Sequence, residues 1–248
     1  MTSAAPREAV EPRTHERWAA PCPELDRRFE AILFDWDGTA VPDRMSDASE
    51  LRALVEDLCA LGADVAVVTG THLANVDEQL RARPDGPGRL FLCVNRGSEV
   101  FQADAAGVRP LFRRVATREE DAALDAAAAA TVGEFERRGL ESTVSRRLNR
   151  RKIDLIPSPE WNDPPKARIA DLLDAVENRL HDAGIAALHE AVEIARDQSA
   201  VAGLPDARVT SDVKHVEIGL TDKSDASRWL LTRLARSGIG PGLVLVVG

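Results

Sequence analysis

Residues 31–39 read AILFDWDGT, and this stretch decides how the rest of the sequence is interpreted. A short continuous apolar run predicts a strand buried on both faces of a sheet. Asp35 follows it directly, and ligands of open α/β sheets bind at the carboxyl ends of the parallel strands. Because side chains alternate along a strand, Asp35 and Asp37 are expected on one side, with Trp36 on the other. Gly38 then permits a tight turn.

The residues that follow predict an alternation of helices and strands. We expect helix 46–61, strand 64–69, helix 73–83, strand 89–94 and a hairpin strand at 99–102. Strands that alternate with helices through short links are typical of a parallel α/β sheet.

After residue 102 the pattern changes to a second α/β block. An Ala-rich helix is predicted over 117–138 with Thr117 as its N-cap, because Ala is the best helix former. The remaining predicted elements are strands 141–147 and 152–156, helices 164–183 and 185–200, one or two strands within 208–219, helix 223–237 and strand 243–247.

The expected fold class is therefore α/β, a Rossmann-like parallel sheet core with an inserted α+β cap. We predict four parts: a flexible leader at 1–28, a first core part at 29–102, the cap at 103–208 and a second core part at 209–248.

Asp35 and Asp37 are the leading candidates for catalysis. One carboxylate at the end of a strand can attack phosphorus, and the other can protonate the leaving oxygen and then activate water. Two anions beside an anionic substrate need a divalent cation, for which Mg²⁺ is the natural ion at an all-oxygen site. The alternative is an acidic turn without chemistry, or an Asp that caps a helix.

The sequence AILFDWDGT resembles the first motif of the haloacid dehalogenase-like (HAD) phosphatases. The resemblance implies that Asp35 is the nucleophile, that Asp35 and Asp37 bind Mg²⁺, and that Thr69 and Gly70 in DVAVVTGT bind phosphate. Lys223, in LTDKSDASRWLL, stands where the family has a lysine that pairs with the phosphate and the nucleophile. The alternatives are a Thr69 that only caps the next helix and a Lys223 that only faces solvent.

The long interval between Thr69 and Lys223 places the cap after the third strand. That placement resembles the Cof-type sugar phosphatases and the trehalose-phosphatase-like enzymes. The family has acidic metal ligands directly after a last strand, and here the sequence reads LVLVVG at residues 243–248. We therefore expect a C-terminally truncated fragment, with a further metal ligand beyond residue 248.

Substrate contacts are expected from Asn95 and Arg96, at the end of the third strand. A basic cluster around a predicted cap turn can also meet an anionic substrate, although a solvated charged turn is the simpler interpretation. This cluster consists of Arg146, Arg147, Arg150, Arg151 and Lys152.

The composition of the chain limits the classes of partner that it can bind. The formal net charge of −9 argues against nucleic acid as a partner. No apolar run approaches the roughly 20 residues of a membrane span, and the N-terminal residues lack the apolar stretch of a signal peptide. Three scattered cysteines, Cys22, Cys59 and Cys93, favour a reduced, cytoplasmic compartment, with the last two as small core residues.

The sequence thus predicts a Mg²⁺-dependent phosphomonoester hydrolase that forms an aspartyl-phosphate and acts on a small phosphorylated metabolite, such as a sugar phosphate. Two alternatives stay open: a sugar phosphomutase, and a catalytically incomplete HAD-like module of a longer protein.

Overall fold

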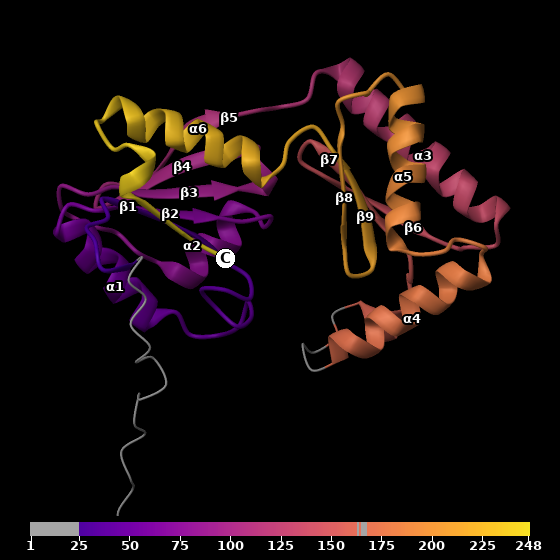
Figure 1. Cartoon of the computed structure of the whole chain (residues 1–248), viewed down its shortest axis with the longest axis horizontal. Coiled ribbons are helices and arrows are strands. Elements are labelled where there is room, and N and C mark those ends of the chain that lie inside the picture. Colours follow the sequence, from indigo (N-terminus) through magenta and orange to yellow (C-terminus); the bar gives the residue numbers. More distant parts are fainter. Residues whose placement is uncertain (1–24, 163, 165–167) are drawn as a thin grey trace, which may run out of the picture.

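A computed structural model describes residues 25–162, 164 and 168–248. Most of the predicted leader and Cys22 lie outside the described residues. The fold has two sheets, each with its own helices and core, side by side (Figure 1). The chain passes from the first unit to the second after β5 and returns before α6. No helix within the described ranges has the length and apolar character needed to cross a membrane.

The main sheet has six strands in the order β10-β1-β2-β3-β4-β5, of which the first four run parallel and the last two antiparallel. Its strands are β1 (Ala31–Asp35), β2 (Asp64–Val68), β3 (Leu90–Val94), β4 (Glu99–Asp104), β5 (Gly107–Arg113) and β10 (Val244–Val247). Its helices are α1 (Ser49–Ala60), α2 (Leu73–Leu80) and α6 (Lys223–Arg236), with short 3-10 turns at Asn95–Gly97 (η3) and Pro241–Leu243 (η6).

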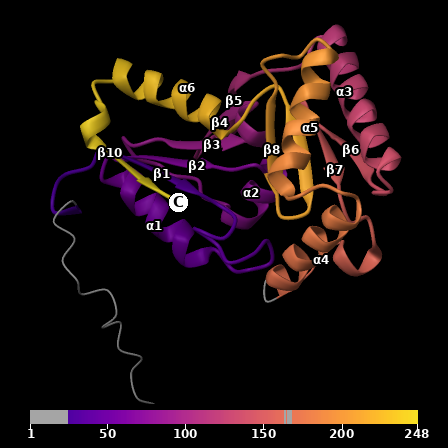
Figure 2. The same ribbon diagram turned by 45° about the vertical axis from the view of Figure 1, so that its right-hand side comes forward.

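Period-two alternation divides the core of this unit into two layers. In β2, Val65 and Val67 pack with α1 and α2, whereas Ala66 and Val68 pack with α6. The two views agree that α6 covers one face of the sheet and that α1 and α2 cover the other (Figures 1 and 2). A strand buried on both faces must be apolar throughout, which explains the continuous apolar runs of the sequence.

The second unit is an antiparallel sheet in the order β6-β7-β9-β8, covered by helices that share one apolar core with it. Its elements are β6 (Thr143–Arg147), β7 (Arg150–Asp154), β8 (Arg208–Asp212), β9 (His215–Gly219), α3 (Arg118–Arg137), α4 (Ile169–Asp182), α5 (Leu188–Val201) and the 3-10 turn η4 (Pro159–Trp161). Thr117 is the N-cap of α3, as predicted, and forms a capping box with Glu120. The α/β class with a second unit after the third parallel strand is therefore confirmed.

The chain passes between the two sheets at residues other than the predicted 103 and 208. Strand β5, which is absent from the predicted elements, pairs with β4 and keeps residues 107–113 in the main sheet. Pro110 weakens a strand prediction, but β5 is an edge strand, where a residue without an N–H is tolerated. Strands β8 and β9 were predicted at about the right residues, but their backbones pair with β7 rather than with the core.

Candidate active site

Asp35 is the last residue of β1, at the carboxyl end of the parallel strands. Its Oδ1 accepts a hydrogen bond from the Trp36 backbone N–H at 2.8 Å and one from Lys223 Nζ at 2.7 Å. Asp35 Oδ2 has no hydrogen-bond partner within the described part of the chain. Trp36 points away into the core, where it is 1% exposed and donates from Nε1 to Gln79. Asp35 and Trp36 therefore point in different directions, as predicted.

Asp37 lies in the turn that follows β1. Gly38 has a φ of +86°, the left-handed conformation that glycine adopts readily, and its N–H donates to the carbonyl of Val41 at 2.8 Å. This turn holds Asp37 beside Thr69, whose Oγ1 donates to Asp37 Oδ2 at 3.3 Å. The two residues come from neighbouring strand ends and meet only because β1 and β2 are paired in parallel.

Thr69 is not the N-cap of the next helix, which removes the alternative considered for it. The N-cap of α2 is His72, and its side chain makes no capping hydrogen bond. Thr69 is 1% exposed, and its hydroxyl accepts from the backbone N–H of Thr71 at 3.2 Å while it donates to Asp37.

Lys223 is the first residue of α6, and its ammonium group reaches Asp35. A cation is unfavourable at the positive end of a helix dipole, so local helix stability does not explain a lysine here. Asp222 caps the helix instead, through a capping box with Asp225. The side chain of Lys223 is 41% exposed, so it is accessible to a ligand as well as paired with Asp35.

Arg44 is a site residue that the sequence analysis missed. Its Nε lies 3.7 Å from Asp37 Oδ1, in the loop between β1 and α1. A single arginine in a polar loop carries no pattern that separates it from other surface arginines. The charges of Arg44 and Lys223 balance those of Asp35 and Asp37. Binding of a phosphate dianion therefore requires further positive charge.

Asn95 and Arg96 follow β3 and both have left-handed backbones, with φ of 52° and 49°. Two consecutive non-glycine residues in this region cost on the order of 1–3 kcal/mol each, a strain that is typical of functional sites. The amide of Asn95 donates to Glu99 at 2.5 Å, so that side chain is already engaged. Arg96 reaches into the second unit, where its Nε lies 2.5 Å from Glu217 Oε2.

Gly97 completes this turn and packs against the start of α6. Its φ is +84°, and an added Cβ would stand 1.9 Å from the carbonyl oxygen of Asp222. The turn therefore links the end of β3 to the helix that carries Lys223, and only glycine fits there.

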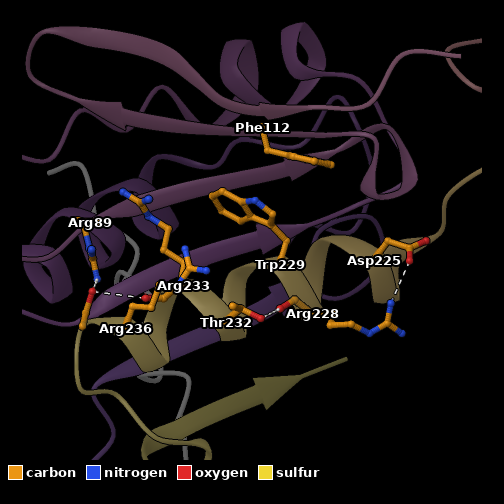
Figure 3. A pocket seen from close by; sticks show the side chains of 9 residues that line it. Arg89, Phe112, Asp225, Arg228, Trp229, Thr232, Arg233 and Arg236 are labelled. Carbon is orange, nitrogen blue, oxygen red and sulfur yellow. Dashed lines mark hydrogen bonds and ion pairs between the residues drawn. The ribbon is translucent and has the colours of Figure 1, made fainter. Parts of the chain in front are cut away.

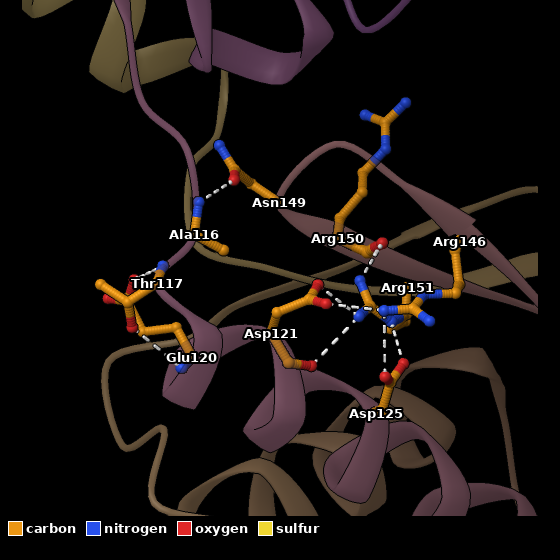
Figure 4. Close-up of polar contacts among 9 residues, drawn as sticks. All are labelled: Ala116, Thr117, Glu120, Asp121, Asp125, Arg146, Asn149, Arg150 and Arg151. Carbon is orange, nitrogen blue, oxygen red and sulfur yellow. Dashed lines mark hydrogen bonds and ion pairs between the residues drawn. The ribbon is translucent and has the colours of Figure 1, made fainter.

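The basic cluster predicted in the second unit divides into two groups (Figure 4). Arg146 and Arg151 turn toward α3 and pair with Asp121 and Asp125 at distances of 2.5–3.1 Å. Arg151 is 1% exposed and therefore structural, whereas the side chain of Arg146 is 61% exposed and Arg147 is exposed, as in the solvated turn considered above.

Arg150 points in the opposite direction, toward the main sheet (Figure 4). Its Nη2 donates to the carbonyl of Gly70 at 2.9 Å, directly after Thr69. Its Nε and Nη1 are buried without a hydrogen-bond partner, although Nη1 lies 3.8 Å from Glu217. Burial lowers the pKa of Arg150, against the opposing charge of Glu217. A desolvated cation with unused donors therefore lies beside the predicted phosphate loop.

Glu217, on β9, is the shared anion of this junction and was also missed by the sequence analysis. Its side chain is 4% exposed and faces Arg96 and Arg150, with Lys152 Nζ at 3.6 Å. We name Arg96, Arg150 and Glu217 the junction cluster. It connects the second unit to the loop that contains Gly70.

The donor set fits a magnesium ion, because Mg²⁺ prefers oxygen ligands and is commonly held by one or two carboxylates, substrate phosphate and waters. Asp35 can supply a carboxylate oxygen, and Asp37 can supply its backbone carbonyl. Within the described residues, no cluster of three or more acidic, His or Cys side chains is arranged to hold a metal. The further acidic ligand that the resemblance implies beyond residue 248 stays a prediction.

Comparison of sequences finds no matching family model and no matching curated protein. Comparison of structures does find relatives. The structure of Plasmodium falciparum IMP-nucleotidase has a TM-score of 0.57 at 13% identity, with 90% of this chain and 55% of that chain covered. An N-terminally truncated form of the same protein gives 0.56 at 14% identity, with 89% and 61% covered.

A crystal structure from Eubacterium rectale has a TM-score of 0.52 at 14% identity, with 89% of this chain and 81% of that chain covered. The present chain spans 53–62% of the IMP-nucleotidase chains that it matches. At these identities the likeness concerns the fold, which includes both the main sheet and the unit inserted after its third parallel strand. The chain therefore shares its fold with IMP-nucleotidase and with the Eubacterium rectale protein.

Proposed function

We propose that the chain is a Mg²⁺-dependent phosphomonoester hydrolase that forms an aspartyl-phosphate on Asp35. One observation carries the proposal: at the carboxyl ends of β1 and β2, Lys223 contacts Asp35, and Thr69 contacts Asp37, two residues further along the chain. Two carboxylates, a hydroxyl and an ammonium group are the groups that phosphoryl transfer requires.

We propose one role for each group. Asp35 Oδ1 is occupied by two donors, which leaves Oδ2 free to attack phosphorus in line. As the bond to the leaving oxygen breaks, Asp37 gives that oxygen a proton. In the second step Asp37 takes a proton from water, whose oxygen attacks phosphorus and releases Asp35 and orthophosphate. Thr69 and Lys223 stabilise the charge on the equatorial oxygens.

Asp35 would hold the Mg²⁺ through a carboxylate oxygen, and Asp37 would hold it through its backbone carbonyl, which leaves the Asp37 carboxyl group for proton transfer. When bound, the ion supplies positive charge between the carboxylates and the phosphate. Lys223 and Arg44 together only balance the two carboxylates and leave the charge of a phosphate dianion unmatched, which supports the requirement for a divalent ion.

The junction cluster supports a polar, hydroxyl-rich leaving group such as a sugar. A phosphate on the Thr69–Gly70 loop directs its leaving group toward the second unit, where Arg150 contacts Gly70. Guanidinium groups only donate hydrogen bonds and the carboxylate of Glu217 only accepts them. A hydroxyl group does both, so it can bridge such a pair. The second unit, which we propose acts as a cap, would also exclude water from the first step.

The cysteines support the proposed cytoplasmic location. Cys59 and Cys93 are free and buried, and burial raises their thiol pKa values to about 11 and about 12. Such thiols are small core residues, as predicted, and suit a reducing compartment.

Release of orthophosphate from p-nitrophenyl phosphate and from a panel of sugar phosphates and nucleotides tests the proposal. We expect turnover with Mg²⁺, none with EDTA, and a preference for sugar phosphates. The absence of turnover on every phosphomonoester at saturating Mg²⁺ would refute the hydrolase. Turnover without a preference for sugars would refute only the substrate class.

A further inference from the structure

A cavity of about 580 Å³ lies along α6, apart from the candidate active site (Figure 3). This volume is within the roughly 300–1,000 Å³ of small-molecule sites. None of Asp35, Asp37, Thr69 and Lys223 lines it. We name it the α6 groove, and its lining residues are Arg89, Phe112, Asp225, Arg228, Trp229, Thr232, Arg233, Arg236 and Ser237.

Four of the lining residues are arginines, and two of them have carboxylate partners. Arg89 pairs with Asp64, and Arg228 pairs with Asp225 at 3.1 Å. Their charges are therefore largely balanced within the protein.

Arg233 and Arg236 have no carboxylate partner in the described part of the chain. Arg233 Nε is buried without a hydrogen-bond partner, and the guanidinium lies over the rings of Phe91 and Trp229 at 6.0 and 5.8 Å. A buried donor without an acceptor costs about 1–3 kcal/mol. A ligand anion in the groove would satisfy donors that the protein leaves unused.

Aromatic rings form another wall of the groove. Phe112 of β5 and Trp229 of α6 have ring centroids 5.9 Å apart at an interplanar angle of 34°. Figure 3 shows the two rings next to each other, with Trp229 on the side toward Arg233. A half-buried indole beside unpaired guanidinium groups offers stacking and anion binding within one ligand's reach.

We propose that the α6 groove binds a nucleoside diphosphate, with the base against Trp229 and Phe112 and the phosphates on Arg233 and Arg236. Arginine binds phosphate oxygens through paired N–H groups, and every base has a face that can stack on a ring. An inorganic anion would use the arginines and leave the aromatic wall without a role. The inference stands independently of the proposed hydrolase.

Titration calorimetry with ADP on the full chain in EDTA tests the proposal, since EDTA prevents metal-dependent turnover. We expect ADP to bind more tightly than pyrophosphate or adenosine. Arg236→Gln, an exposed position, should weaken ADP binding about tenfold because one charge-assisted contact is lost. Arg233→Lys keeps the charge but loses the paired N–H groups of the guanidinium, so it should also weaken ADP binding. Arg196→Gln, at an exposed arginine of α5, is the matched control.

Lys223→Met distinguishes binding in the α6 groove from binding at the candidate active site, because it changes only the latter. It should leave ADP binding unchanged. Loss of binding in Lys223→Met with retention in Arg236→Gln would place the nucleotide at the candidate active site and overturn the proposal. So would the absence of binding at millimolar ADP, or pyrophosphate binding as tightly as ADP. Thermal melting of each variant checks that the fold is intact.

Discussion

Lys223 Nζ lies 2.7 Å from Asp35 Oδ1, although the two residues are 188 positions apart in the sequence. The whole second unit lies between them in the chain. The contact is made because α6 packs on the main sheet with its first residue at the carboxyl end of β1. This pair is the most direct link between the fold and the proposed chemistry.

Replacement of the nucleophile should abolish turnover and leave the fold unchanged. We expect Asp35→Asn to lower kcat for p-nitrophenyl phosphate by roughly 10⁴-fold or more, because an amide oxygen does not attack phosphorus. Asp57→Asn, on the exposed side of α1, is the control and should keep full activity. Substantial Mg²⁺-dependent turnover by Asp35→Asn, measured by p-nitrophenol release, would contradict the assignment.

Loss of the active-site lysine should affect activity much more than stability. Lys223→Met removes an electrostatic contact to the phosphoryl group, so kcat should fall by about 10²–10³-fold. The melting temperature should change little, because a cation at this helix end is unfavourable for the dipole. Partial recovery in Lys223→Arg would identify the charge as the cause. Equal activity of Lys223→Met and the unmodified chain would rule out this role.

Removal of the shared anion of the junction cluster should destabilise the protein. Glu217→Gln leaves Arg96, Arg150 and Lys152 without their common buried carboxylate. We expect the free energy of unfolding in urea to fall by about 3 kcal/mol. Glu193→Gln, which breaks only the exposed pair with Arg196, should change it by less than about 0.5 kcal/mol. Equal effects of the two substitutions would contradict the buried role of Glu217.

His215 should make the protein less stable in mild acid. Burial lowers the pKa of His215 to about 4, with a further contribution from the charges of Lys152 and Lys214, against the opposing charges of Asp154 and Asp212. Between about pH 6.5 and 4 the unfolded chain therefore binds a proton that the folded chain does not. Stability rises with pH across this window and is lost as the pH falls through it.

The size of this effect is roughly 1–3 kcal/mol. Urea unfolding at pH 7 and pH 5 measures it, with His215→Gln as the comparison, because Gln does not titrate. We expect the difference between the two pH values to be smaller in His215→Gln. The same difference in both proteins would show that other groups cause the pH dependence.

Gly97 and Gly133 should respond in opposite directions to alanine. Gly97→Ala forces a methyl group into the carbonyl of Asp222 at a positive φ, so stability and phosphatase activity should both fall. Gly133 is inside α3 with open space around it, and Ala there should stabilise the helix by up to about 1 kcal/mol. The melting temperature of each variant measures both effects. An unchanged melting temperature in Gly97→Ala would contradict the close fit of Gly97 against Asp222.

Local pattern was enough to predict most of the elements and the two acidic side chains. The apolar run of β1 followed by Asp35 marks a buried strand and its end, because both properties depend on neighbouring residues alone. The N-cap Thr117 was likewise predictable, because a helix start depends on the residues next to it. Strand β5 was missed because Pro110 is compatible with a strand only at a sheet edge, and edge position is a property of the whole sheet.

Arg44 and Glu217 could not be found in this way, and Arg150 was named only as one of five basic residues around a turn. Arg150 stands next to Arg151 in the chain, yet one turns to Gly70 and the other to α3, since side chains alternate along β7. Which of the two faces the junction depends on how the second sheet is placed against the first. The substrate contact of Asn95 stays a prediction, and the hydrogen bond from its amide to Glu99 is known only from the tertiary structure.

The amino-acid sequence by itself determined the α/β alternation, the position of the second unit after the third parallel strand, and Asp35 and Asp37 at the end of β1. Tertiary structure alone decided that Lys223 meets Asp35, that Arg150 reaches Gly70 and that Glu217 joins the two units. The physical reason is range. Backbone propensity and burial periodicity act over a few residues, whereas hydrogen bonds and ion pairs form wherever packing brings charged side chains within about 3 Å.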